Sequence, residues 1–124
     1  METKPLHAVI ETPLFIARAK KLLSDEVVKE LVNAVAADPW QGDVMEGTGG
    51  ARKMRWARPG TGKRGGFRVV YFHHSADVPI FLLDIYGKNE KANLSKAERN
   101  ELATILARVV AAYREGVREH VESR

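Results

Sequence analysis

The sequence predicts an α+β fold, in which helices pack on one face of a small antiparallel β-sheet. Three β-forming runs follow one another between residues 52 and 86, and their short links favour antiparallel neighbours. Two stretches with helical apolar spacing precede these runs, and a longer one follows them. The predicted order of elements is therefore β-α-α-β-β-β-α.

Length and composition predict one soluble domain spanning residues 1–124. A chain of this size buries about two-thirds of its unfolded surface, which suffices for a core without covalent links. The sequence has no Cys, which excludes disulfides and thiolate metal sites and fits a reducing cytoplasm. No stretch approaches the roughly 20 apolar residues of a membrane span, and the N-terminus has no signal-type apolar run. We therefore expect a cytoplasmic protein.

The N-terminal third predicts one strand and two helices. Residues 6–11 alternate in the manner of a short strand. Thr12 and Pro13 favour a helix start, with the threonine as N-cap and the proline at the first helical position. Ser24 is a second N-cap candidate, followed by two acidic residues and an apolar stripe at i, i+3, i+4, i+7 spacing. Pro39 ends this second helix.

The next three predicted elements are strands at residues 52–57, 66–73 and 78–86. The first alternates apolar and basic residues, and the other two are rich in residues that favour extended structure. A capping box then opens a long helix, with Ser95 as N-cap and Glu98 three residues later. The apolar face of this helix runs from Leu102 to Tyr113, with Val117 as a possible extension.

Side chains alternate between the two faces of a strand, so the strand register decides which residues meet. We expect these side chains to point towards the helices: Met54, Trp56, Phe67, Val69, Tyr71, Phe81, Leu83 and Ile85. The opposite, open face then receives Lys53, Arg55, Arg68 and Tyr86, with Asp84 beside them.

Basic residues are concentrated in one segment. Between residues 52 and 68 there are seven basic side chains and no acidic one, whereas the rest of the chain has 13 basic and 16 acidic residues. The seven are Arg52, Lys53, Arg55, Arg58, Lys63, Arg64 and Arg68. Such a cluster predicts a polyanionic partner. The alternative is a set of solvated charges on an exposed surface, which would be the better reading of an isolated pair.

Neither the glycine-rich loop nor the histidines form a recognised binding motif. The glycine-rich loop at residues 60–66 is not a P-loop, because the required glycine and hydroxyl positions hold Ala57 and Arg64. The four histidines are too scattered for a metal motif, so neither metal nor cofactor is expected. His73 and His74 should point to opposite faces, and either can be a proton-transfer group or a polar strand end.

Four aromatic side chains can stack on unpaired bases: Trp56, Phe67, Phe72 and Tyr86. Trp56 and Phe67 fit a core position better, because they alternate with cations that point outwards.

Three motifs together carry a family resemblance: G-T-G-G-x-R-K-x-R, G-K-R-G-G-x-R-V-x-Y, and I-Y-G-K-N-E followed by an L-S helix start. On these motifs the chain resembles the RelE superfamily of bacterial toxins over roughly residues 6–113, and within it the HigB branch, which includes phage-derived Gp49-like proteins. The resemblance implies the toxin of a toxin-antitoxin system, an enzyme that enters the ribosome and cuts mRNA. Its implied partners are mRNA, the ribosome and an antitoxin, often a helix-turn-helix protein; no membrane is implied.

The implied chemistry is metal-independent attack of a ribose 2′-OH on the adjacent phosphate. By the family pattern, Arg68 stabilises the phosphate, and Lys53 or Arg55 acts as base. Many members carry a further Arg or His after the last strand and a Tyr in the C-terminal segment, which this chain lacks at those places. Lys88 is therefore the first candidate for the general acid and Tyr86 the second.

The remaining basic residues are expected to bind RNA or the ribosome: Arg52, Arg58, Lys63 and Arg64. The loop with Lys63 and Arg64 is longer than in the shorter relatives and is expected to contact ribosomal RNA. Two alternatives stay open: a non-catalytic protein that occupies the ribosome or RNA, and a ParE-like toxin of the same fold acting on DNA gyrase. The second has less need of clustered phosphate-binding residues.

Overall fold

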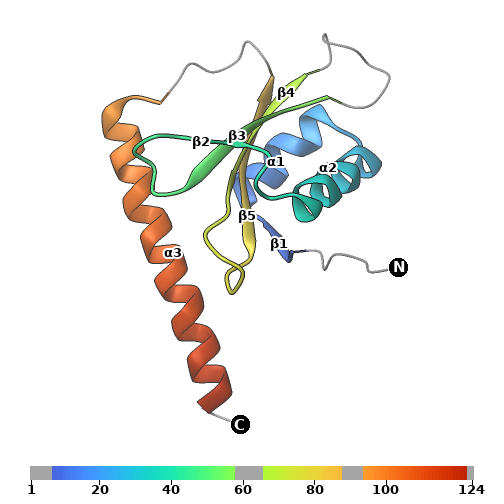
Figure 1. The fold of residues 1–124 in the computed structure, drawn as a ribbon. Coiled ribbons are helices and arrows are strands. Elements are labelled where there is room, and N and C mark those ends of the chain that lie inside the picture. Colours follow the sequence, from blue (N-terminus) through green and yellow to red (C-terminus); the bar gives the residue numbers. More distant parts are fainter. Residues whose placement is uncertain (1–6, 58–65, 88–93, 123–124) are drawn as a thin grey trace.

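The fold is built on one mixed β-sheet with helices on both sides (Figure 1). The computed structural model describes residues 7–57, 66–87 and 94–122. Within them the sheet has five strands in the order β1-β5-β4-β3-β2, with β1 parallel to β5 and the other pairs antiparallel. The elements are β1 (Val9–Glu11), α1 (Pro13–Leu22), α2 (Asp25–Ala37), β2 (Asp43–Val44), β3 (Ala51–Trp56), β4 (Phe67–Phe72), β5 (Ile80–Gly87) and α3 (Lys96–Glu122). The predicted α+β class is confirmed, and the short edge strand β2 is an addition to the predicted order.

All three helices begin where the sequence predicts. The Thr12 hydroxyl accepts a hydrogen bond from the N–H three residues on, and Pro13 opens α1. The Ser24 hydroxyl caps α2 in the same way. At α3 the Ser95 N–H donates to the Glu98 carboxylate at 3.0 Å, and the Glu98 N–H donates to the Ser95 hydroxyl at 3.1 Å. Local hydrogen bonds at the N-termini therefore fix where the helices begin.

The main core lies between the sheet and the pair α1 and α2. Phe15 from α1 and Leu31 from α2 are fully buried there. They pack with the inward side chains of β3, β4 and β5, namely Met54, Trp56, Val69, Tyr71, Ile80, Leu82 and Ile85. The predicted inward positions on β3 and β4 are confirmed, with Phe67 partly buried against the same cluster.

On β5, the predicted inward direction is wrong for two residues. Phe81 and Leu83 pack on the opposite face, and Leu82 takes the inward position. The cause is a β-bulge, because the register of β4 with β5 skips Leu83. Beyond the bulge the prediction holds again, with Ile85 in the core and Asp84 on the other face.

Helix α3 packs against the opposite side of the sheet from α1 and α2 (Figure 1). Leu106 and Val110 of α3 form a second buried cluster with Ala51, Phe72 and Val78. The predicted arrangement of helices on one face thus describes α1 and α2. The third helix covers part of the other face and leaves the rest open.

The glycine-rich turn between β2 and β3 lies against α3. Gly49 has a φ of +77°, which a residue with a side chain rarely adopts. A Cβ atom there would lie 3.6 Å from Ala103 of α3. Lower on the helix, Arg114 binds Asp77 through two hydrogen bonds of 2.8 and 3.0 Å, which lower the pKa of this exposed carboxyl. Contacts from two sheet connections therefore set the position of α3.

The Tyr71 hydroxyl holds the loop between α2 and β2 against the core. It accepts a hydrogen bond from the Gly42 N–H at 2.8 Å and donates one to the Pro39 carbonyl at 2.9 Å. Its side chain is fully buried, and this burial raises the pKa of the phenol.

We predict that Tyr71→Phe lowers the free energy of unfolding by about 1–3 kcal/mol, because the buried Gly42 N–H loses its acceptor. Urea denaturation of both proteins measures this difference. Tyr113→Phe, at a partly exposed position of α3, is the matched control and should stay within about 0.5 kcal/mol of wild type. Equal midpoints for Tyr71→Phe and wild type would contradict the assigned role of the hydroxyl.

Candidate nucleic-acid interface

Three side chains stand in one row across the face that α1 and α2 do not cover. Arg55 of β3 is the register partner of Arg68 of β4, and Arg68 is the partner of Tyr86 of β5. Directly opposed residues in antiparallel strands have Cβ atoms about 4.5–5.5 Å apart. We call these three residues the arginine row. Two residues along the strands, Lys53 and Asp84 flank Val70 in a second row on the same face.

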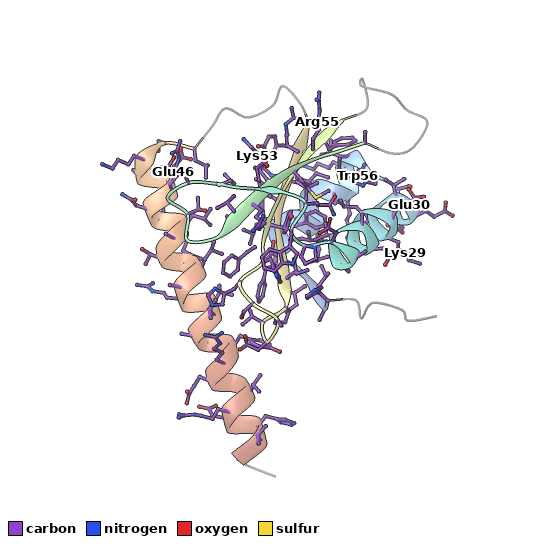
Figure 2. All side chains as sticks on the ribbon, viewed as in Figure 1. Lys29, Glu30, Glu46, Lys53, Arg55 and Trp56 are labelled. Carbon is purple, nitrogen blue, oxygen red and sulfur yellow. The ribbon has the colours of Figure 1, made fainter. Side chains whose placement is uncertain are left out.

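The placement of this row follows from burial of the alternating residues. Met54 and Trp56 lie in the main core, so their neighbours Lys53 and Arg55 must point the other way. Figure 2 shows Trp56 on the side of β3 that faces α1 and α2, with Lys53 on the opposite side. The structure therefore brings Lys53, Arg55, Arg68 and Tyr86 to one face, as the alternation predicts.

The row has an unsatisfied hydrogen-bond donor. The Nη1 atom of Arg68 is buried and has no acceptor among the described residues. A buried guanidinium nitrogen without an acceptor is costly, and the opposed Arg55 adds like-charge repulsion. Both costs fall when an anion binds between the two guanidinium groups. The arrangement thus suits a phosphate, whose oxygens match the planar fork of arginine.

Tyr86 adds a proton donor to the row. Its side chain is buried, and this burial raises the pKa of the phenol. The charge of Arg68 lowers that pKa and the charge of Asp84 raises it, but burial dominates. At neutral pH the hydroxyl keeps its proton and can donate it in a hydrogen bond to an oxygen held by the arginines.

An acidic residue, Asp84, also lies at the site. The sequence predicts its place on the open face but no partner for it. Asp84 is buried and accepts a hydrogen bond from the Ile85 N–H at 2.8 Å. Arg18 of α1 reaches the same carboxylate, with its Nε atom 3.4 Å from Oδ1. No local pattern in the sequence indicates this pair, because Arg18 comes from a distant helix.

A cavity of about 540 Å³ opens beside the arginine row, between the sheet and the first turns of α3. Tyr86 belongs to both the row and the cavity wall. The lining is mostly aliphatic, with a few polar groups, and includes Lys53, Asp84, Tyr86, Glu101, Leu102 and Ile105. A volume of this size is typical of binding pockets for small organic groups.

Comparison with known proteins agrees with this fold. The sequence profile described as RelE toxin of the RelE / RelB toxin-antitoxin system matches residues 9–124. The chain belongs to the RelE toxin family. It is a toxin of a toxin-antitoxin system, and family membership implies a cognate antitoxin as partner.

A solved structure supports the toxin fold. The free state of a mutant of the E. coli toxin RelE aligns with a TM-score of 0.50 and 17% sequence identity, over 68% of this chain and 85% of that one. At this identity the match is evidence for the fold alone. Among the residues that the structure describes, no helix of the toxin is long and apolar enough to cross a membrane.

Not every predicted site residue of the toxin joins the row. Arg52 points to the opposite face, and its Nη1 donates to the carbonyls of Gly42 at 2.7 Å and Trp40 at 3.3 Å. Its guanidinium also lies over the Trp40 ring, 5.2 Å from the centroid. These contacts give Arg52 a structural role in the loop before β2. The other predicted residues lie outside the described part of the chain: Arg58, Lys63, Arg64 and Lys88.

The two neighbouring histidines of the toxin do differ in exposure. His73 is buried between His7 and Trp40, and both its ring nitrogens lack a hydrogen-bond partner among the described residues. His74 is exposed. Burial of His73 removes it from the candidates for proton transfer on the open face. In the described ranges no three His, Asp or Glu side chains are grouped to hold a metal ion.

Burial lowers the pKa of His73, and the nearby charges of His7, Arg52 and His74 lower it further. The unfolded chain therefore binds more protons than the folded one below about pH 6.5, and the fold loses stability there as pH falls. We predict that His73→Phe weakens this pH dependence between pH 6.5 and 5, by at most about 1.4 kcal/mol per pH unit. His120→Gln, on the exposed end of α3, is the control. Urea denaturation at a series of pH values tests this, and an unchanged slope for His73→Phe would refute it.

Proposed function

We propose that this toxin is a ribosome-dependent mRNA endonuclease of the HigB and Gp49-like branch, acting as a single domain in the cytoplasm. The observation that carries the proposal is the arginine row, in which Arg55 and Arg68 are register partners and the Nη1 of Arg68 is buried without an acceptor among the described residues. Such a site is incomplete without an anion. A single-stranded RNA in the ribosome would supply one in its scissile phosphate.

The row supports electrostatic catalysis. In the proposed reaction a 2′-oxygen attacks the neighbouring phosphorus, so negative charge grows on the non-bridging oxygens. Arg68 and Arg55 would each donate hydrogen bonds to those oxygens from opposite strands. Preorganised donors of this kind stabilise the transition state more than the ground state, because they need no rearrangement as the charge develops.

Proton transfer completes the proposed reaction. Lys53, one row along at about 7 Å by the strand rise, is the first candidate to take the 2′-OH proton, with Arg55 as the second. The bond from phosphorus to the 5′-oxygen then breaks, and that oxygen takes a proton from Lys88 or Tyr86. The products are a 2′,3′-cyclic phosphate and a 5′-hydroxyl. Of the two acid candidates, Tyr86 lies next to Arg68 in the sheet and keeps its proton at neutral pH, whereas Lys88 lies outside the described residues.

The remaining partners are also proposals. Arg58, Lys63 and Arg64 would bind ribosomal RNA, and a helix-turn-helix antitoxin would neutralise the toxin by covering its cationic face. The proposed chemistry needs neither metal nor cofactor, since the row itself supplies the positive charge.

We predict that Arg68→Ala and Lys53→Ala each lower mRNA cutting by about 100-fold or more, because the first removes a donor to the phosphate oxygens and the second removes the group that takes the 2′-OH proton. Primer extension on an mRNA with translating ribosomes measures the cut. The matched controls are Arg108→Ala on α3 and Lys29→Ala on α2, both at exposed positions (Figure 2 labels Lys29). Circular dichroism confirms that each variant is folded.

Full cutting by both site variants would refute the site assignment. If the wild type arrests growth but produces no new mRNA 5′ ends, the toxin is a non-catalytic binder. Inhibition of gyrase supercoiling by the wild type would instead support a ParE-like toxin. Cutting without ribosomes would contradict ribosome dependence alone.

A separate prediction identifies the acid. If Tyr86 protonates the leaving oxygen, Tyr86→Phe lowers the single-turnover cutting rate by about 100-fold, within the range for general acid catalysis, while binding to the ribosome is unchanged. Lys88→Ala then has an effect below about threefold. The reverse ranking in the same assay would assign the role to Lys88.

A further inference from the structure

We propose that the cavity between the sheet and α3 binds the base of a nucleotide next to the cut, and selects bases that carry an exocyclic amino group. This inference rests on the proposed function for its biological setting, and it adds a specificity site to it. The cavity itself is defined by described residues of the sheet, α1 and α3.

The cavity lies next to the arginine row. Tyr86 forms part of both, and Lys53 and Asp84 of the second row lie in the cavity wall. Two residues along a strand correspond to about 7 Å. A phosphate on Arg55 and Arg68 therefore places the base of the same nucleotide, or of the next one, at the cavity mouth.

Two walls of the cavity are aliphatic. Val70 and Leu83 line the sheet side, and Leu102 and Ile105 line the α3 side. Ile105 and Leu14 remain 47% and 49% exposed at the rim, so this aliphatic surface lacks cover among the described residues. A base has two flat faces of low polarity, and burying them between aliphatic walls removes both surfaces from water.

The cavity also carries charged side chains, most of them acidic. Glu98, Glu101 and Asp84 place three carboxylates in the lining, against the single cation of Lys53, and carboxylates repel a phosphate and accept hydrogen bonds from N–H groups. Glu98 already accepts the Ser95 N–H, and Asp84 already binds Arg18 and the Ile85 N–H. Glu101 is therefore the main acceptor for a base. Adenine, cytosine and guanine offer amino donors, and carboxylates accept from such groups in known nucleic-acid complexes. Uracil has a ring N–H at N3 but no amino group, so it should bind more weakly.

A protein segment is the competing occupant. An apolar antitoxin side chain would also fill the aliphatic part of the cavity. It would add no donor for the Glu101 carboxylate unless it also carried a basic group. The adjoining phosphate site favours RNA, and the test below separates the two.

The binding test uses the full-length wild-type toxin, freed of antitoxin, and needs no cleavage. NMR spectra of the methyl groups of Leu14 and Ile105 are recorded with cytidine, adenosine and uridine 5′-monophosphates. We expect shifts at both methyl groups, and binding of the cytidine and adenosine nucleotides about fivefold or more tighter than the uridine nucleotide. Ile105→Trp should block the cavity and abolish these shifts at Leu14. Val117→Trp, which alters an equally exposed position of α3 outside the cavity, should not.

The cutting test maps mRNA 5′ ends after induction of the toxin. We expect the wild type to disfavour uridine at one fixed position beside the cut, and Glu101→Ala to reduce that preference about fivefold. Glu119→Ala, at another exposed glutamate of α3, should leave it unchanged.

Each outcome bears on one proposal. Equal binding of all three nucleotides, or no methyl shift with any of them, overturns the base pocket even if mRNA is cut as proposed. Shifts caused only by an antitoxin peptide overturn it in favour of a protein-docking site. Selective nucleotide binding without any mRNA cutting supports the pocket and refutes the endonuclease instead.

Discussion

The antiparallel register of β3, β4 and β5 is the constraint on which the site depends. One face of these strands supplies Met54, Trp56, Val69 and Tyr71 to the core beneath α1 and α2. Because side chains alternate, burying that face fixes which residues occupy the other. A slip of one residue between β3 and β4 would separate Arg55 from Arg68 and bury a charge. The hydrophobic core therefore enforces the charge arrangement of the open face.

The arrangement works against stability at the site itself. Two opposed arginines repel each other, and a buried guanidinium nitrogen without an acceptor loses its hydration. The main core offsets these costs with fully buried Phe15, Leu31 and Tyr71. Binding of a phosphate would relieve the strain at the row. A preorganised electrostatic site lowers the stability of the free protein in this way. In return, its donors need no rearrangement during the reaction.

The sequence predicts structural features that depend on interactions between residues close together in the chain. Helix starts at Thr12, Ser24 and Ser95 depend on side chains within three residues, and all three were predictable. Strand alternation likewise gave the meeting of Lys53, Arg55, Arg68 and Tyr86 on one face.

Features that depend on distant partners could not be read in this way. The bulge at Leu83 reversed two positions on β5, because pairing geometry with β4 decides it. The contact of Arg18 with Asp84 joins a helix to a strand, and Arg52 is held by the backbone of the loop before β2. The side of the sheet that α3 covers, and hence the cavity, depends on packing of Leu106 against Phe72. No periodicity within α3 specifies that choice.

The central claim is that Arg55 and Arg68 act on a single phosphate, and a double-mutant cycle tests it most directly. Single-turnover cutting rates on the ribosome are measured for wild type, Arg55→Ala, Arg68→Ala and the double variant. Residues that act as a unit give strongly non-additive losses. The account predicts that the double variant cuts no more than about threefold more slowly than the slower of the two single variants. Losses that multiply in full would show that the two arginines work independently, and would contradict a shared phosphate site.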